Sequence, residues 1–187
     1  MTRRFALQAS LGLLAGPGLA QARLPQFRTA RYQFIELDPV EPMAPLSVLR
    51  LDGKPATARP APGKVNLVYL WATWCPVCRI TLPRFERQIA DFGAKGVEIV
   101  TISTDEREPA HVRAYLARLG VRRLPVFHDR GGKAIAASGA GQPISTAEGL
   151  PAIYVTDRRG GVRGYMLGEA DWASPQAMAL LEHVGAL

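Results

Sequence analysis

The stretch Trp74-Cys75-Pro76-Val77-Cys78 decides the fold, because it holds both cysteines of the chain, three positions apart. An apolar run over residues 65–71 precedes it, and a segment able to form a helix, residues 79–94, follows it. A strand that delivers two cysteines to the first turn of a helix is the arrangement that dithiol redox chemistry requires. Unpaired backbone N–H groups and the helix dipole would stabilise a thiolate at Cys75. Cys78, one turn further on, could close a disulfide with it, so the pattern predicts Cys75 as the nucleophile.

Two other interpretations of the cysteine pair have to be weighed. Two cysteines at this spacing are half of a zinc site, but zinc usually takes four ligands, and the sequence has no second cysteine pair. The three histidines show no paired spacing: His111, His128 and His183. A purely structural disulfide is the other alternative. The position of the pair between an apolar strand and a helix favours redox activity, with no metal and no cofactor.

The first 22 residues differ in composition from the rest of the chain. They begin with Arg3 and Arg4, continue with small and apolar residues over 5–19, and end in Ala20-Gln21-Ala22, which fits a signal-peptidase site. We therefore expect residues 1–22 to be a cleaved signal peptide of a periplasmic protein. An uncleaved membrane anchor is the alternative, although the apolar run is short for a spanning helix. The start also matches a twin-arginine signal in part, so the export route stays open.

Length and charge narrow the functional classes. The 187 residues are enough for one domain with a sizeable core. The formal net charge is +7, but lysine and arginine are dispersed, without a basic run or interleaved aromatic residues. This distribution argues against a nucleic-acid partner. Because disulfides persist outside the cytoplasm, a single closely spaced cysteine pair in an exported protein indicates disulfide exchange rather than a structural crosslink.

The rest of the chain alternates strand and helix patterns, which predicts an α/β fold with a central mixed sheet flanked by helices. An edge strand is expected at 32–37, a loop with three prolines at 38–45, and a hairpin at 46–57 around Asp52-Gly53. Further strands are expected at 65–71, 97–103, 124–128, 152–156 and 162–167, and helices at 79–94, 109–119, 133–138 and from Pro175 onward. Residues 23–45 are interpreted as an N-terminal extension and 46–187 as the domain.

The cysteine segment also resembles a known family. The segment is similar to the active-site segment of the exported TlpA-like thioredoxins, which include the ResA-like and CcmG-like thiol–disulfide oxidoreductases. The residues that carry the similarity are Leu70-Trp71-Ala72-Thr73-Trp74-Cys75-Pro76-Val77-Cys78-Arg79, followed by Leu82-Pro83. Thr104-Asp105 at the end of the strand expected at 97–103, and Gly149-Leu150-Pro151 before the strand expected at 152–156, are further matches. The resemblance covers the chain from about residue 46 onward. It implies a thioredoxin fold with a strand–helix insertion between its halves, and a cis peptide bond before Pro151.

The resemblance further implies a function. Such a protein is a periplasmic thiol–disulfide oxidoreductase that reduces protein disulfides through Cys75 and Cys78. Substrate-contacting residues implied by it are Trp74, Pro76, Leu150 and Pro151. Its substrates would be apocytochrome c or copper-site assembly proteins, its electrons would come from a membrane thiol donor, and it would act as a monomer. A copper-handling chaperone that uses the same thiols as soft ligands is the alternative. Peroxide reduction is disfavoured because there is no separate peroxidatic cysteine.

Three features depart from the family pattern. Typical thioredoxins carry a buried acid at the position of Tyr69, and many exported relatives carry Glu at the position of Thr81. Such an acid acts as a base towards the buried thiol, so its absence leaves open how the Cys78 proton is removed. The loop over residues 140–148 is also longer than usual, and it could reshape the substrate groove.

Overall fold

The computed structural model describes residues 24–137, 143–147 and 149–187. The expected signal peptide and part of the loop 140–148 lie outside these ranges. The strands are β1 (Ile35–Pro42), β2 (Leu46–Arg50), β3 (Pro55–Ala58), β4 (Val65–Trp71), β5 (Val97–Ser103), β6 (Val126–His128), β7 (Ala152–Thr156) and β8 (Gly161–Leu167). The helices are α1 (Cys78–Ala94), α2 (Pro109–Arg118), the 3-10 turn η1 (Arg130–Gly132), α3 (Lys133–Ala137) and α4 (Pro175–Ala186). Within the described ranges, none of these helices combines the length and the apolarity needed to span a membrane.

The strands form one mixed sheet in the order β1-β8-β7-β4-β5-β6-β2-β3. Every residue of β4 is buried, because β4 runs between parallel β5 and antiparallel β7. The units β4-α1-β5 and β7-β8-α4 are the two halves of a thioredoxin fold, and α2, β6 and α3 lie between them in the chain. Of these, β6 and α3 follow each other in the strand–helix order that the resemblance implies for the insertion. The predicted hairpin β2–β3 joins the sheet through β6. The fold class expected from the sequence is therefore confirmed.

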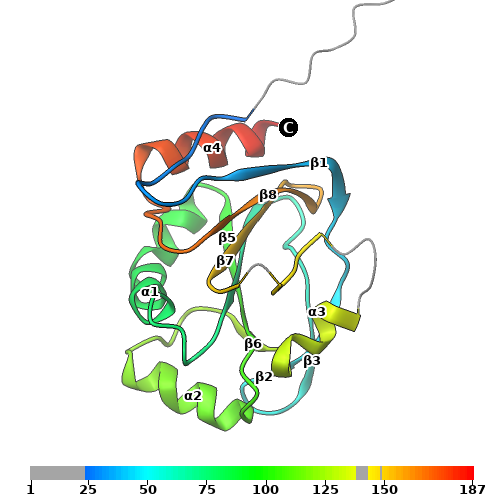
Figure 1. Ribbon diagram of the computed structural model, residues 1–187, viewed down its shortest axis with the longest axis vertical. Helices are drawn as coiled ribbons and strands as arrows, with labels where there is room; N and C mark the ends of the chain where they lie inside the picture. Colours follow the sequence, from blue (N-terminus) through cyan, green and yellow to red (C-terminus); the bar gives the residue numbers. More distant parts are fainter. Residues whose placement is uncertain (1–23, 138–142, 148) are drawn as a thin grey trace, which may run out of the picture.

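Helices cover both faces of the sheet (Figure 1). On one face, alternate residues of β4 such as Leu67 and Trp71 pack with apolar residues of α1, α2 and α4. On the opposite face, Val68 and Leu70 pack with Ile135 of α3. Because the side chains of a strand alternate between faces, β4 contributes to both cores, and the segment that follows it is held between them.

The N-terminal part of the sheet differs from the expectation. Residues 38–45 are predicted to form a loop, and this prediction is wrong for residues 38–42, because β1 continues to Pro42 and pairs with β8. Residues 43–45 do form a loop. The pairing is irregular between Glu36 and Glu41, and the Asp38–Pro39 bond is cis. A proline has no N–H to donate, so it is tolerated on an edge strand, which has a partner on only one side. Part of the expected extension is thus built into the sheet.

Candidate active site

Cys75 and Cys78 form a disulfide beyond the carboxyl end of β4, with their Cα atoms 5.3 Å apart. The chain turns after Trp71, and α1 begins at Cys78. The backbone N–H of Cys78 donates a hydrogen bond to the Cys75 sulfur at 3.2 Å. The first N–H groups of a helix have no acceptor within the helix, so this one is free to stabilise negative charge on Cys75 after reduction.

The residues that flank the cysteines are more exposed than the cysteines themselves. Trp74 is 68% exposed and Pro76 also faces solvent, whereas Cys75 is 2% and Cys78 0% exposed. The sequence pattern predicts that Cys75 lies at an exposed helix start. This prediction is wrong for the oxidised form, because Cys75 lies before the helix and its sulfur is bonded to the buried Cys78. Trp74 therefore offers the accessible apolar surface next to the disulfide.

The loop that contains Leu150 and Pro151 reaches the same edge of the sheet. Leu70, near the end of β4, pairs with Ala152 at the start of β7, so Pro151 lies level with the residues that lead into the cysteines. The Leu150–Pro151 bond is cis. The Pro151 carbonyl accepts a hydrogen bond from the Gly168 N–H at 2.9 Å, which ties this loop to the segment after β8. Pro151 is buried, and Leu150 is half-buried.

A buried carboxylate, to which the sequence analysis assigns no role, holds the turn before Cys75. Asp105, 1% exposed, lies just after β5. Its carboxylate accepts hydrogen bonds from the Thr73 backbone N–H at 2.9 Å, the Thr73 Oγ1 at 2.5 Å and the Ser103 Oγ at 2.7 Å. These bonds fasten the residue two positions before Cys75 to the neighbouring strand. Asp105 is thus a positioning residue for the redox site.

Two of the three histidines meet this cluster, although their spacing in the sequence indicates no relation. The Nε2 atom of His111 lies 3.5 Å from Thr73 Oγ1. The Nε2 atom of His128, which is 1% exposed, lies 3.0 Å from the Asp105 carbonyl oxygen. His111 thus lies beside the Thr73 hydroxyl, and His128 contacts the main chain of Asp105. Within the described parts of the chain, no three His, Cys, Asp or Glu side chains gather as a set of metal ligands.

Tyr69 and Thr81, the two positions at which the resemblance leads one to expect an acid, are neighbours in the core on the α1 side of the sheet. Tyr69 is fully buried, and its ring meets that of Phe85 edge to face at 5.5 Å. Burial raises the pKa of Tyr69 above its usual range, so the phenol stays protonated. Thr81 lies beside it, but the Thr81 hydroxyl donates to the Val77 carbonyl at 3.2 Å. In the described structure the Tyr69 hydroxyl has no hydrogen-bond partner of good geometry, and neither residue is a base at neutral pH.

Thr81→Glu is expected to speed disulfide turnover several-fold near pH 7. The mixed disulfide is resolved only by the Cys78 thiolate, and a carboxylate one helical turn away would take its proton. The measurement is turnover against pH, with Thr81→Gln as a control of the same size but without the charge. Equal rates for wild type and Thr81→Glu, with both proteins folded, would show that another base already serves Cys78.

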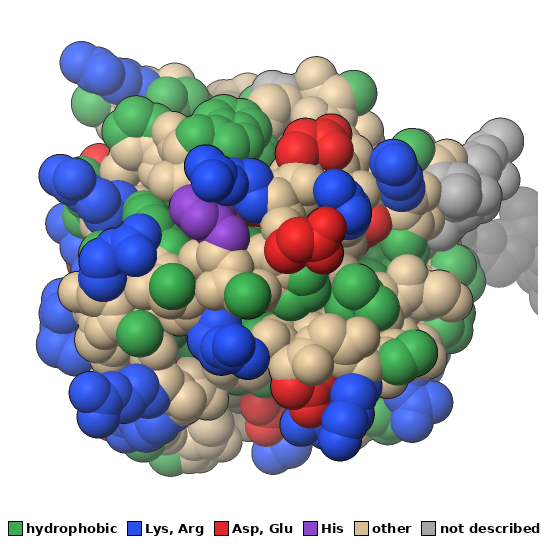
Figure 2. All heavy atoms as spheres, turned by 90° about the horizontal axis from the view of Figure 1, so that it is seen from below, with side chains coloured by type: hydrophobic (Ala, Val, Ile, Leu, Met, Phe, Trp, Pro, Cys, Tyr) green, Lys and Arg blue, Asp and Glu red, His purple; other side chains and the backbone are tan. Residues whose placement is uncertain are grey.

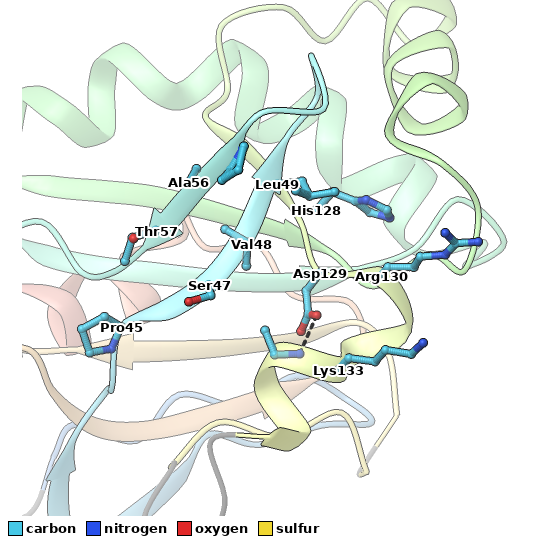
Figure 3. A pocket seen from close by; sticks show the side chains of 12 residues that line it. Pro45, Ser47, Val48, Leu49, Ala56, Thr57, His128, Asp129, Arg130 and Lys133 are labelled. Atoms are coloured by element: carbon cyan, nitrogen blue, oxygen red, sulfur yellow. Dashed lines mark hydrogen bonds between the residues drawn. The ribbon is translucent and has the colours of Figure 1, made fainter.

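A surface hollow of about 880 Å³ does not contain the redox residues. It lies between the β2–β3 hairpin and the η1–α3 segment (Figure 3). Asp129, on its wall, already accepts hydrogen bonds from the Ala134 and Ile135 N–H groups at 2.7 and 3.0 Å and so caps α3. Figure 2, which views the molecule from the side of α2, shows Lys and Arg side chains spread over the face with acidic groups between them. Neither feature competes with the disulfide as the reactive centre.

Comparisons with known proteins agree with this geometry. A model of the AhpC/TSA family matches residues 40–165. The thiol-disulfide oxidoreductase ResA of Bacillus thuringiensis (strain Al Hakam) is 30% identical over 122 residues, which are 65% of this chain and 65% of that protein. A thioredoxin-family thiol:disulfide interchange protein from Chlorobium tepidum TLS is 25% identical, with a TM-score of 0.60 over 80% of this chain and 99% of that chain. A second Chlorobium tepidum structure, of a candidate thiol:disulfide interchange protein DsbE, is 22% identical and has the same fold, with a TM-score of 0.64 over the same shares.

Proposed function

Because the chain belongs to the AhpC/TSA family, we propose that it is an extracytoplasmic thiol–disulfide oxidoreductase that reduces disulfides of other proteins through Cys75 and Cys78. One observation carries the proposal: the disulfide lies at the start of α1, and the Cys78 N–H donates to the Cys75 sulfur. A helix N–H at a sulfur favours its thiolate form. Both cysteines of the chain are used by this pair, which leaves no separate cysteine for attack on a peroxide.

The reaction follows from the two sulfurs. The Cys75 thiolate attacks one sulfur of the substrate disulfide, the other substrate sulfur leaves as a thiolate, and a mixed disulfide forms. The Cys78 thiolate then attacks the Cys75 sulfur and releases the second substrate thiol. Two electrons have passed to the substrate, and the protein is left with the Cys75–Cys78 disulfide. A thiol donor must reduce this bond before the next cycle.

The proposed substrate contacts lie around the disulfide. Trp74 and Pro76 are exposed on one side of it, and we assign them to apolar contact with the substrate. Leu150 and Pro151 form the facing loop, whose backbone we assign to pairing with the backbone of an extended substrate segment. In this arrangement the substrate cysteine is held above Cys75 while exchange takes place.

The proposed partners follow the family resemblance of the cysteine segment. They are apocytochrome c cysteines or copper-site assembly proteins as substrates, and a membrane thiol protein as electron donor. The apolar, arginine-led N-terminus of the sequence supports export to the periplasm. The protein is proposed to act there as a monomer.

The reduction potential tests the direction of the reaction. A reductase is expected to have a potential near the thioredoxin value of about −270 mV rather than the DsbA value of about −120 mV. The fraction of the Cys75–Cys78 disulfide is measured after equilibration with glutathione buffers of known ratio. A strongly oxidising value would overturn the reductase assignment. Tight one-to-one binding of Cu(I) by the reduced protein, together with no reduction of insulin disulfides, would instead identify a copper chaperone.

A further inference from the structure

A short turn before β1 is folded tightly on itself. The Thr29 N–H donates to the Tyr32 carbonyl at 2.7 Å, and the Tyr32 N–H donates to the Thr29 hydroxyl at 2.9 Å. Arg28 and Gln33 form an isolated antiparallel bridge at its base. We call residues 28–33 the N-terminal turn. These bonds give its backbone a defined shape, so each residue of the turn has a fixed place along the surface.

The N-terminal turn is anchored beside the Pro151 loop. The preceding residue, Phe27, is 4% exposed and packs edge to face on Trp172, with ring centroids 5.1 Å apart. Tyr32 lies directly over Gly168, where a side-chain carbon would collide with its ring. The Gly168 N–H in turn donates to the Pro151 carbonyl at 2.9 Å. Figure 1 shows the corresponding bend of the N-terminal segment, in blue, beside the orange segment after β8.

The N-terminal turn and the redox motif line a common pocket of about 290 Å³. Its walls are Thr29, Ala30, Arg31, Tyr32, Val77 and Glu169. Val77 lies between the two cysteines, so the pocket opens next to the disulfide. A substrate whose cysteine is joined to Cys75 would therefore place a neighbouring side chain within reach of it.

The charge available in the pocket is positive. Glu169 is already paired with Arg84, whose Nη1 lies 3.0 Å from its carboxylate. Arg31 is exposed and has no ion pair within the described residues. The guanidinium of Arg31 is thus the uncompensated charge, and an acidic side chain is its natural partner.

We propose that the N-terminal turn forms a specificity pocket in which Arg31 selects substrate proteins that carry an aspartate or glutamate next to the reacting cysteine. The inference rests on the proposed disulfide exchange at Cys75 and deepens it by naming the substrate class. An ion pair on the protein surface contributes modestly, and salt screens it. We therefore expect Arg31 to change the relative rates of disulfide exchange with different substrates, while the exchange itself depends on the two cysteines.

Peptide disulfides test the selection. The substrates are homodimeric disulfides of the peptide Ala-X-Cys-X-Ala, with X as Glu, Gln or Lys. Each is mixed with the reduced mature protein, and the fluorescence of the protein is followed to obtain the single-turnover rate. Wild type is expected to favour Glu over Gln by about two- to fivefold, the range that exposed ion pairs give, and Gln over Lys by a similar factor. The preference should fade at about 0.5 M salt. Arg31→Glu should reverse the order.

Arg28→Glu is the matched control, because Arg28 belongs to the same turn but does not line the pocket. It should keep the wild-type preference for Glu. The proposed selection by Arg31 would be overturned if Arg31→Glu and Arg28→Glu showed the same peptide preference, or if wild type showed none. Hydroxyethyl disulfide, which is neutral and has no flanking residues, should react equally with all three proteins. If wild type failed to reduce this compound, the proposed function itself would be wrong, independently of the pocket.

Discussion

Asp105→Asn should lower the free energy of unfolding by about 2–3 kcal/mol, because hydrogen bonds to a buried charged group contribute about 1.5–3 kcal/mol each. The carboxylate accepts bonds from the backbone and hydroxyl of Thr73 and from the hydroxyl of Ser103. An asparagine keeps one acceptor oxygen, but its NH₂ group must face one of these donors. The variant loses both the charge and at least one bond. Unfolding of the oxidised protein in denaturant at pH 7 measures the loss.

The same substitution should slow disulfide exchange about tenfold, since a loosened turn presents Cys75 less often in the attacking geometry. Thr73→Ser, which keeps the hydroxyl, should behave nearly as wild type, and Thr73→Val should fall between the two. A purely structural role for Asp105 would lower stability and leave the exchange rate of the folded protein unchanged. Wild-type stability together with a wild-type rate would show that the carboxylate does not hold the turn.

The Asp105 cluster shows what the sequence could and could not reveal. The fold was predictable, because an apolar run followed by two cysteines and a helix fixes β4 and α1, and the flanking periodicity supplies the remaining elements. The contact between Thr73 and Asp105 was not, since they are 32 positions apart. It depends on the parallel register of β4 and β5, which sets Trp71 opposite Ser103. Only the paired strands bring the two residues together.

The prediction for the N-terminal region was wrong for a different physical reason. Three prolines between residues 38 and 45 indicate a loop if a strand is assumed to need backbone N–H donors towards two neighbouring strands. However, β1 is an edge strand and pairs with only one strand, β8. The burial of Phe27 against Trp172 joins two segments from opposite ends of the chain. Neither segment has a sequence feature that points to the other, so the wall that the N-terminal turn adds to the site was not predictable.

Cys78→Ser is expected to trap substrates covalently. Attack by Cys75 does not require the second cysteine, but release of the mixed disulfide does. The helix N–H at the Cys75 sulfur supports Cys75 as the attacking thiolate, and Cys78, 0% exposed, as the resolving one. The variant, expressed from the full sequence with residues 1–22 included, should give high-mass adducts in a bacterial periplasm, visible on a non-reducing gel and lost on reduction. Mass spectrometry of the adducts would identify the partner.

Cys75→Ser is the matched control, since it removes the other sulfur of the same disulfide and should trap little. The Cys78 side chain is 0% exposed and belongs to the first residue of α1, so we expect its thiol not to reach a disulfide in another protein. Both variants should lose all multiple-turnover activity, because neither can close the Cys75–Cys78 bond that ends the cycle. Equal trapping by the two variants would refute the assigned roles. Absence of adducts from both would argue against protein disulfide exchange and favour a binding role for the two thiols.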